Sequence, residues 1–338
     1  MMNISVIGSG GWGCAIASLL KKNGNNVCLW SWLESESRQI EKDGENKEFL
    51  PGIKLPEGMV YTSDLKYAAE FGDMYVLAVP SHAVKTTAQN LSAVIKKGVP
   101  IVNVAKGFEG ETLGLLSDVI GEACPENPVA VLSGPSHAEE VARGIPTTVV
   151  AASEDEEIAK TVQDLFSSPT FRVYTCDDVV GVEIGGALKN IIALCAGVSD
   201  GLGLGDNTKA ALMTRGIVEI QRLGVKMGAQ AHTFNGLTGV GDLIVTCTSM
   251  HSRNRRAGIL IGEGMSPEDA LKKVHMVVEG VNATKAAYSL AQKYDVDMPI
   301  ITAAYKVLFE GAQPRDAVLS LMTREKKSEA ELLFGKEI

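Results

Sequence analysis

The sequence predicts an α/β fold in which a doubly wound, mostly parallel sheet is followed by an all-helical domain. Three observations lead to this prediction: short apolar runs recur through the first half, helical stretches separate them, and strand signals nearly vanish after residue 180. Runs that are apolar along their whole length are typical of strands buried on both faces of a parallel sheet. Alternation of such strands with helices predicts a doubly wound arrangement. We therefore expect two domains, residues 1–180 and residues 181–338.

The individual elements can be placed in order. Seven strands are predicted, at residues 3–8, 26–30, 74–79, 100–105, 129–134, 147–152 and 171–175. In the second half, apolar residues recur at helical spacing at Ile184, Leu188, Ile191 and Cys195. Residues 267–274, 283–294 and 300–310 are predicted to be helical as well. The boundary near residue 180 carries no flexible linker, and no internal repeat is present.

Composition excludes several classes of protein. Apolar residues make up 45% of the 338 residues and charged residues 22%, which is typical of a folded chain with a sizeable core. The net charge of −9 argues against nonspecific binding to nucleic acid or to an anionic membrane. We expect no signal peptide, since residues 1–10 lack a basic region and run into glycines, and no membrane span, since no apolar stretch of about 18 residues stands out. The six scattered cysteines lack a C-x-x-C pair, which favours free thiols in the cytoplasm over disulfides or a metal site.

A glycine motif follows the first predicted strand. Residues 6–17 contain Gly8-x-Gly10-x-x-Gly13 at the point where a predicted strand gives way to a predicted helix. An ordinary glycine-rich turn is the alternative, but this position in the chain predicts a Rossmann-type dinucleotide site. Gly8 permits the tight turn, Gly10 lets backbone approach the pyrophosphate, and Gly13 allows close packing of the helix, whose N-terminus favours an anion. Cofactor contacts are expected from Gly8, Gly10, Gly11, Trp12 and Gly13.

The second predicted strand lacks the acidic residue that usually follows it in such sites. Ser31, Trp32 and Leu33 stand there, and Glu34 and Glu36 are the nearest acids. The contact to the adenine ribose is therefore left open.

Lys189 lies in the middle of an apolar helical stretch, residues 185–194. Burying an ammonium is costly unless a partner or a pKa shift compensates. Hydride transfer to a ketone builds negative charge on oxygen, and a lysine can both stabilise that charge and supply a proton. Gly185 and Gly186 would leave room for a ligand beside it. The helix alone does not distinguish this function from a lysine that reaches the surface.

Six further segments occur in a fixed order along the chain. They are residues 78–84 (AVPSHAV), 103–109 (NVAKGFE), 132–147 (LSGPSHAEEVARGIPT), 185–212 (GGALKNIIALCAGVSDGLGLGDNTKAAL), 237–258 (LTGVGDLIVTCTSMHSRNRRAG) and 277–288 (VVEGVNATKAAY). Together they closely resemble the bacterial-type NAD(P)-dependent glycerol-3-phosphate dehydrogenases. The resemblance implies a helical domain similar to the C-terminal domain of 6-phosphogluconate dehydrogenase. It also implies a homodimer that uses NAD or NADP to interconvert sn-glycerol 3-phosphate and dihydroxyacetone phosphate, for glycerophospholipid synthesis.

The resemblance implies roles for individual residues. Lys189 is expected to transfer the proton, next to Asn190, with Asp242 and Thr246 in its polar network; Lys106 is expected to contact both substrate and cofactor. Further substrate contacts are expected from Gly134, Ser136, Ser252, Arg253 and Asn254. Further cofactor contacts are expected from Trp32, Ala138, Arg253, Val277 and Glu279.

Several of these residues also have a purely structural interpretation. Asp242 and Thr246 are four residues apart and share a helix face, yet an aspartate there could simply be an N-cap. Ser136 could cap the next helix, Lys106 could be a solvated loop residue, and residues 252–256 (SRNRR) could be a solvated basic face. Within that run, Arg255 and Arg256 are expected at the surface, and His82 and His137 are expected to be structural.

Two other functions are compatible with a dinucleotide-binding fold. A noncatalytic dinucleotide sensor would not need Lys106, Lys189, Asp242 and residues 252–254 together. A β-hydroxyacid dehydrogenase would meet a carboxylate where we expect a phosphate.

The residues after the second strand also bear on the choice of cofactor. Many relatives carry a basic residue there, where it can meet the 2′-phosphate of NADP. Here Trp32 and Leu33 offer no cation, so NADH is expected to be preferred over NADPH. Arg38 is the alternative cation, although a helix starting near Glu34 would place it one turn away.

Overall fold

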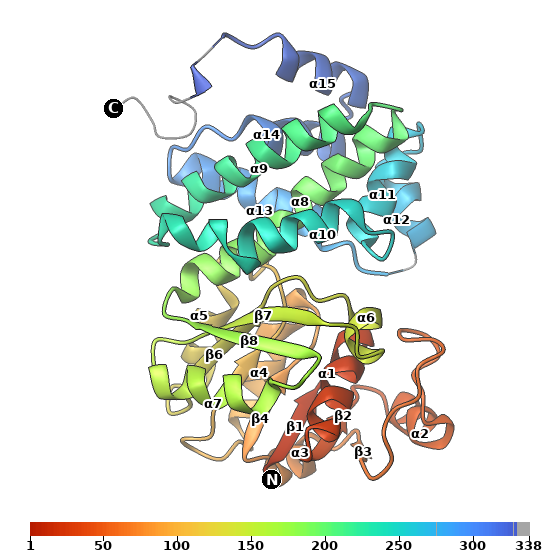
Figure 1. Cartoon of the computed structure of the whole chain (residues 1–338), viewed down its shortest axis with the longest axis vertical. Coiled ribbons are helices and arrows are strands. Elements are labelled where there is room, and N and C mark those ends of the chain that lie inside the picture. The colour runs from red at the N-terminus through yellow and green to blue at the C-terminus, as the bar shows by residue number, and fades with distance from the viewer. Residues whose placement is uncertain (275, 327, 330–338) are drawn as a thin grey trace. The chain divides into compact units, whose positions relative to one another are not determined.

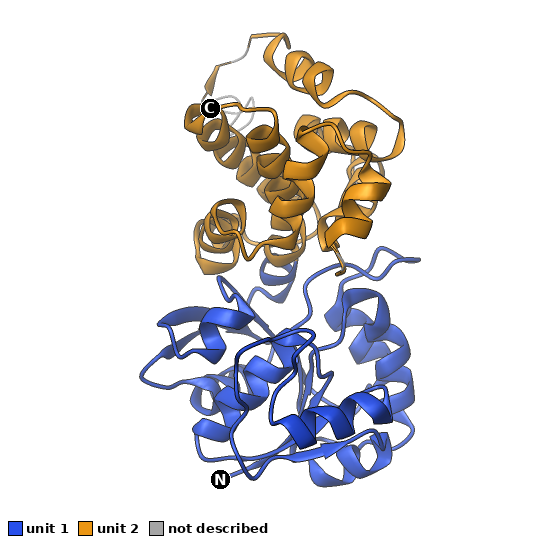
Figure 2. Ribbon diagram, turned by 90° about the vertical axis from the view of Figure 1, so that its right-hand side faces the viewer, with its two compact units in different colours: residues 1–183 blue, residues 184–338 orange. Residues whose placement is uncertain are grey.

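The chain folds into two compact units, which the computed structural model describes for residues 1–274, 276–326 and 328–329. The first unit is Met1–Glu183 and the second is Ile184–Ile338 (Figure 2). The second domain expected from the sequence includes residues 275, 327 and 330–338, which lie outside the described ranges.

The first unit is built on an eight-stranded sheet. The strands are β1 (Asn3–Ile7), β2 (Asn26–Trp30), β3 (Val60–Thr62), β4 (Met74–Leu77), β5 (Ile101–Asn103), β6 (Val129–Ser133), β7 (Thr147–Ala152) and β8 (Phe171–Cys176). Their order is β3-β2-β1-β4-β5-β6-β7-β8, as expected for a doubly wound sheet. All pairs are parallel except β6 and β7. The seven predicted strands are confirmed, and β3 is an additional strand that the apolar runs do not predict.

Helices cover both faces of this sheet (Figure 1). They are α1 (Gly11–Lys22), α2 (Glu34–Asp43), α3 (Leu65–Phe71), η1 (Ser81–Ala83), α4 (Val84–Ser92), α5 (Leu116–Ala123), α6 (Ala138–Ala142) and α7 (Glu156–Phe166). Side chains of β1 alternate between two cores: Ile4 and Val6 pack with α1, α6 and α7, whereas Ile7 packs with α3, α4 and α5. Between these two helical layers the parallel strands end along one edge, where ligands bind in folds of this kind.

Within its described residues, the second unit contains helices and the loops between them, without strands. It contains the larger part of α8 (Val179–Gly201), α9 (Asp206–Lys226), the short turns η2 (Ala231–Asn235) and η3 (Leu237–Gly241), α10 (Asp242–Thr248), α11 (Arg253–Gly262), α12 (Pro267–Val274), α13 (Glu279–Lys293), α14 (Pro299–Phe309) and α15 (Pro314–Met322). The three helices predicted beyond residue 260 are confirmed as α12, α13 and α14. The unit boundary falls inside α8, which continues without interruption from Val179 to Gly201.

Helix α8 is long and apolar enough to pass a composition test for a membrane-spanning helix. An 18-residue window of it has a mean hydropathy of 1.6, so the expectation that no stretch reaches the length of a membrane span was wrong. Within the structure, however, 83% of that window is buried. Its composition is therefore that of a core helix, because a helix surrounded by protein needs no polar face.

Glycines bring α8 and α11 into backbone contact. A Cβ atom on Gly197 of α8 would lie 2.1 Å from the Arg255 carbonyl oxygen, and one on Gly258 of α11 would lie 2.0 Å from that of Leu194. Gly201 and Gly262 extend the contact by one turn on each helix, with similar distances of 2.2 and 2.4 Å. Both helices thus present a G-x-x-x-G pair, and any larger residue would force them apart.

Candidate active site

The glycine motif forms the turn between β1 and α1 in the first unit. Gly8 has φ +122°, and a Cβ there would lie 2.7 Å from the Ala78 carbonyl oxygen. A Cβ on Gly13 would lie 1.9 Å from the Gly8 carbonyl oxygen, so only glycine lets α1 pack this closely. The Cβ position of Gly10 is open, with nothing within 4 Å. Because no side chain caps α1 and its first turn carries no acid, its N-terminus fits a dinucleotide pyrophosphate.

A loop after α2 holds this turn from the other side. The Asn46 side chain is buried and its Nδ2 donates a 2.7 Å hydrogen bond to the Ser9 carbonyl. A Cβ atom on Gly11 would lie 2.5 Å from the Phe49 carbonyl oxygen, so only glycine fits at this position. Trp12, the next residue, has a buried indole Nε1 without a hydrogen-bond partner among the described residues. Asn46 is a contributor that no sequence motif identifies.

The end of β2 exposes two apolar side chains. Trp32 is 69% exposed and Leu33 55% exposed, and the Trp32 ring meets Trp30 edge-on at 6.1 Å between centroids. Helix α2 begins at Glu34, as the sequence suggested, and Arg38 one turn later pairs with Glu34. The alternative cation for an NADP phosphate is therefore already engaged with a carboxylate in this structure.

Lys106 follows β5 at the carboxyl edge of the sheet. The strand ends at Asn103, so Val104 and Ala105 separate it from this lysine. The Lys106 Nζ donates a 2.8 Å hydrogen bond to the Gly134 carbonyl and lies 3.5 Å from Ser136 Oγ. Ser136 Oγ also donates to the Gly134 carbonyl, at 2.8 Å. The structure therefore brings Lys106, Gly134 and Ser136 together from two separate loops.

The turn after β6 excludes the alternative function considered for Ser136. Ser136 is not the cap of the following helix, because α6 begins at Ala138 with His137 in the N-cap position. Gly134 has φ +135°, a conformation that favours glycine, and its Cβ would lie 3.0 Å from Val149 Cα. Ala138 lies beside the glycine turn, 3.9 Å from the Cβ position of Gly11.

The two histidines considered from the sequence differ in their surroundings. His82 is exposed on η1 and has no place in the cluster around Lys106. His137 is partly buried and occupies the N-cap position of α6, although its side chain makes no capping hydrogen bond. A structural role for His137 accords with this position.

Lys189 is buried in the second unit, with 6% of its surface exposed. Its Nζ donates to Asp242 Oδ1 at 2.6 Å and to Thr246 Oγ1 at 2.7 Å. Helix α10 begins at Asp242, so the two acceptors lie one turn apart on the same face, as their spacing predicts. The N-cap position belongs to Gly241, and Asp242 instead pairs with the lysine. The burial of the ammonium is thus compensated by an ion pair and a hydroxyl.

Gly185, one turn before Lys189, packs against the backbone of η3. A Cβ on Gly185 would lie 2.9 Å from the Thr238 carbonyl oxygen. This glycine therefore admits the backbone of η3 against α8, which gives it a packing function beside the lysine. The close approach places η3 and the start of α10 next to the lysine.

Asn190 begins a second polar chain on α8. Its Oδ1 accepts a 2.9 Å hydrogen bond from Asn254 Nδ2, and Asn254 Oδ1 accepts one of 2.8 Å from the Gly280 backbone. The two amides thereby connect α8 with the N-termini of α11 and α13. Asn190 and Asn254 are both buried, at 6% and 8% exposure, so their orientations are fixed by these bonds.

The start of α11 contains the expected phosphate residues. Ser252 is its N-cap, and its Oγ accepts a 3.2 Å hydrogen bond from the Arg255 backbone. Arg253 is the first helical residue and is partly buried. The expectation that Arg255 lies at the surface was wrong: its side chain is 14% exposed and pairs with Asp200 at 2.7 Å. A further contact of Arg255, to the Thr248 carbonyl at 3.0 Å, fixes the loop that leads to Ser252.

The remaining expected residues lie in the second unit. Val277 is partly buried just before α13, and Glu279 is the first residue of that helix. Arg256 is partly buried, not fully exposed, and its Nε has no hydrogen-bond partner among the described residues. No cluster of three or more metal-binding side chains occurs in the described part of the chain. Burial raises the pKa of Cys247, near Lys189, to about 12, so its thiol is not a nucleophile at neutral pH.

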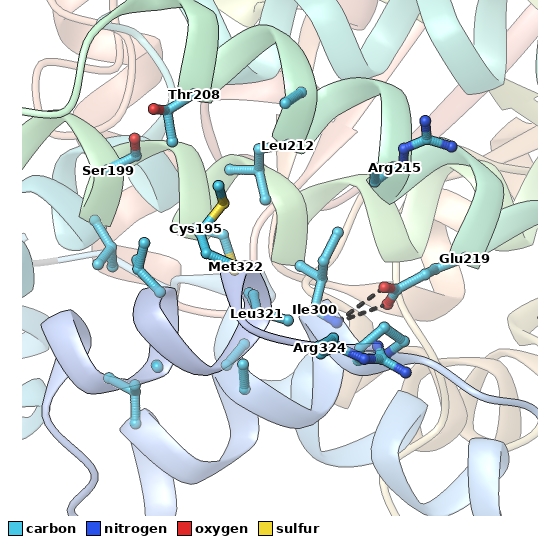
Figure 3. A pocket seen from close by; sticks show the side chains of 18 of the residues that line it. Cys195, Ser199, Thr208, Leu212, Arg215, Glu219, Ile300, Leu321, Met322 and Arg324 are labelled. Carbon is cyan, nitrogen blue, oxygen red and sulfur yellow. Dashed lines mark hydrogen bonds between the residues drawn. The ribbon is translucent and has the colours of Figure 1, made fainter. Parts of the chain in front are cut away.

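A cavity of about 480 Å³ in the second unit lies apart from all of these residues. It is lined mainly by apolar side chains of α8, α9, α14 and α15, and Arg215, Glu219 and Arg324 are among its charged lining residues (Figure 3). In its wall, the Glu219 carboxylate accepts hydrogen bonds from the Ile300 and Ile301 backbone at the start of α14, at 2.9–3.2 Å. Burial raises the pKa of Glu219 to about 8. None of the expected site residues lines this cavity.

Comparison with known proteins gives one consistent result. The family model for the NAD-dependent glycerol-3-phosphate dehydrogenase N-terminus matches residues 3–159, and the model for the C-terminus matches residues 178–319. A glycerol-3-phosphate dehydrogenase [NAD(P)+] from Fusobacterium nucleatum is 55% identical over 97% of this chain and 99% of its own length. The crystal structure of the Coxiella burnetii enzyme is 37% identical, with a TM-score of 0.92 over 96% of this chain and 99% of that one. A glycerol-3-phosphate dehydrogenase structure from Plasmodium falciparum is 25% identical with a TM-score of 0.88, covering 97% of both chains.

Proposed function

The chain belongs to the NAD-dependent glycerol-3-phosphate dehydrogenase family, and we propose that Lys189 exchanges the proton in its reaction. The reaction interconverts dihydroxyacetone phosphate and sn-glycerol 3-phosphate with NAD(P). The observation that carries the proposal is the buried Lys189 ammonium held by Asp242 and Thr246.

The glycine turn and the residues around it are proposed to hold the cofactor. Gly8, Gly10, Gly11 and Gly13 keep side chains away from the start of α1, where backbone N–H groups favour the pyrophosphate. When bound, the nicotinamide cofactor supplies or accepts the hydride. Trp12, Trp32 and Ala138 lie at or near this turn and are proposed as further contacts, together with Arg253, Val277 and Glu279 of the second unit.

Lys189 is proposed to handle the proton that accompanies the hydride. In the reducing direction, the carbonyl oxygen takes a proton from Nζ as the carbonyl carbon gains the hydride, which leaves an alcohol and a neutral amine. The amine regains a proton from water before the next turnover. In the oxidising direction the neutral amine accepts the hydroxyl proton. Asp242 remains ionised throughout, so that it favours the ammonium and fixes its position.

The substrate phosphate is proposed to bind at the start of α11. Arg253 offers a charge-assisted bond, Ser252 a hydroxyl, Asn254 an amide, and the helix N-terminus adds backbone N–H groups. Lys106, Gly134 and Ser136 form the corresponding cluster in the first unit and are proposed to contact the substrate as well. Asn190 is proposed to hold Asn254 in register with Lys189.

The test compares two lysines of the second unit. Lys189→Ala should lower kcat by about 100- to 10,000-fold, the usual contribution of an acid–base group, without weakening NADH binding measured by nicotinamide fluorescence. Lys209→Ala is the matched control, because Lys209 also makes a 2.6 Å ion pair, with Asp200, and is no part of the proposed machinery. A Lys189→Ala enzyme that keeps a kcat close to wild type would refute the assignment.

We also propose a homodimer located in the cytoplasm. Helix α15, one of the helices that line the cavity, has no buried residue, and its Leu319 and Met322 are 61% and 78% exposed. A second copy that covers this helix would remove both side chains from water. All six cysteines are free thiols, which accords with a reducing compartment. Sedimentation of wild type and Leu319→Asp tests the dimer: a monomeric wild type would contradict it.

The product is proposed to supply the glycerol backbone of phospholipids. A cell depleted of this protein should then need added glycerol 3-phosphate for growth. Growth without the supplement would contradict this role.

A further inference from the structure

Glu183 is a buried carboxylate that the proposed mechanism does not use. It lies on α8 with 5% of its surface exposed, between the buried residues Val182 and Ile184. Placing a carboxylate in such surroundings is costly unless hydrogen bonds satisfy it. Burial accordingly raises the pKa of Glu183 to about 7, although hydrogen bonds to it act in the opposite direction. The hydrogen-bond partners of Glu183 therefore indicate its function.

The two oxygens of Glu183 accept hydrogen bonds from two separate segments. Both accept from the Ser117 backbone N–H at the start of α5, at 3.2 and 3.3 Å, and one accepts from the Ser117 hydroxyl. The other segment is the end of β5, where Asn103 Nδ2 donates to Glu183 Oε1 at 3.3 Å. The carboxylate thus connects α8 with both α5 and β5 inside the first unit.

Asn103 in turn shapes the backbone that carries Lys106. It is the last residue of β5 and is completely buried. Its Oδ1 accepts a 3.1 Å hydrogen bond from the Ala105 N–H, and its Nδ2 donates a 3.3 Å bond to the Ala105 carbonyl. The amide therefore holds both polar groups of the residue next to Lys106. An amide that rotated would lose both bonds and release this turn.

We propose that Glu183 is a positioning residue for Lys106, which acts by fixing the side-chain amide of Asn103. The inference rests on the proposed contact of Lys106 with substrate and cofactor. The chain of contacts runs from Glu183 to the Asn103 amide, to the Ala105 backbone, and to the lysine beside it. The alternative is that Glu183 only caps α5, whose N-cap residue Leu115 supplies no side-chain hydrogen bond.

Single substitutions separate positioning from capping. Glu183→Ala and Asn103→Ala should each lower kcat/KM for dihydroxyacetone phosphate by roughly 10- to 100-fold, since a small displacement of a substrate-binding group has effects of that order. Ser117→Ala is the matched control: it removes a hydroxyl from the α5 contact alone and should leave kcat/KM close to wild type. Glu183→Gln keeps an oxygen acceptor and should recover most of the lost activity. If Glu183→Ala and Ser117→Ala lower thermal stability alike and neither changes kcat/KM, the residue is only a cap.

A double-mutant cycle with Lys106 shows whether the effect passes through that lysine. In a Lys106→Ala background, Glu183→Ala and Asn103→Ala should have little further effect on kcat/KM. Losses that multiply independently would overturn the proposal. If Lys106→Ala alone has no effect, the proposed function of Lys106 fails first, which is a distinct result. Should Glu183→Ala not fold, Asn103→Ala and its cycle with Lys106→Ala give the same decision.

Discussion

Removing the charge from Asp242 should destabilise the protein and inactivate it, and a second substitution should separate the two effects. In Asp242→Asn the Lys189 ammonium stays buried without the carboxylate that accepts its 2.6 Å bond. The side chains of this pair are 8% and 1% exposed, so water screens the interaction little. Breaking a buried pair from one side typically costs about 3–5 kcal/mol of unfolding free energy. We expect Asp242→Asn to lie in that range.

The compensating change is Lys189→Met, which removes the cation and keeps a long apolar side chain. Added to Asp242→Asn, it should restore much of the lost stability, because replacing a whole buried pair is often close to neutral. Activity should not return, since Nζ is gone and the acid–base contribution of about 100- to 10,000-fold is lost with it. Urea unfolding followed by circular dichroism gives the stability, and nicotinamide absorbance with dihydroxyacetone phosphate gives the rate. Stability losses that simply add in the double variant would refute the pairing, and measurable recovery of kcat would refute the role of Lys189.

Three other predictions concern the phosphate, the cofactor and pH. Arg253→Ala should lower kcat/KM for dihydroxyacetone phosphate by about 10- to 150-fold, because a charge-assisted bond of roughly 1.5–3 kcal/mol is lost. The kcat/KM for unphosphorylated dihydroxyacetone should fall much less, and equal losses for the two substrates would contradict a phosphate contact. NADH should give a higher kcat/KM than NADPH at equal ionic strength, since Trp32 and Leu33 offer no cation; a preference for NADPH would show that a basic residue elsewhere meets the 2′-phosphate. Burial raises the pKa of the Glu219 carboxyl from 4.5 to about 8. Between these pH values the folded state binds more protons than the unfolded state, so the free energy of unfolding should fall as pH rises from 4.5 to about 8. Glu219→Gln should flatten that fall in urea unfolding measured across the same window, and an unchanged pH profile would contradict the assignment.

The strands of the first unit could be predicted because burial on both faces leaves an apolar run in the sequence. An apolar run does not indicate, however, whether a strand is parallel or antiparallel to its neighbour: β7 is as apolar as the other strands, yet it runs antiparallel to β6. Strand β3 was not predicted because its three residues are all partly exposed and form no apolar run. The helical second unit was predictable as a class, but the partners of its helices depend on contacts between residues far apart in the sequence.

The candidate site shows the same division between local and distant information. Lys189 was conspicuous as a charge in an apolar helix, and the four-residue spacing of Asp242 and Thr246 predicted their shared face. Arg255 was misplaced at the surface because its partner, Asp200, is 55 residues away and no local pattern connects them. Asn46 and Glu183 were missed for a related reason: each is a single polar residue whose importance depends on the backbone it meets after folding.

The glycine contact between α8 and α11 has a consequence for how this protein can change. The four glycines touch no ligand in the proposed site, yet the helices they join carry Lys189 and Asn190 on one side and residues 252–254 on the other. A single added methyl group would meet a carbonyl oxygen at 2.0–2.4 Å in every case. A scan of all single substitutions should therefore show loss of activity at these four glycines. The pattern would resemble that of active-site residues, although the glycines take no part in the reaction. The distance between these two helices is therefore fixed, and substitutions in the loops at their ends should be tolerated more readily than substitutions at the four glycines.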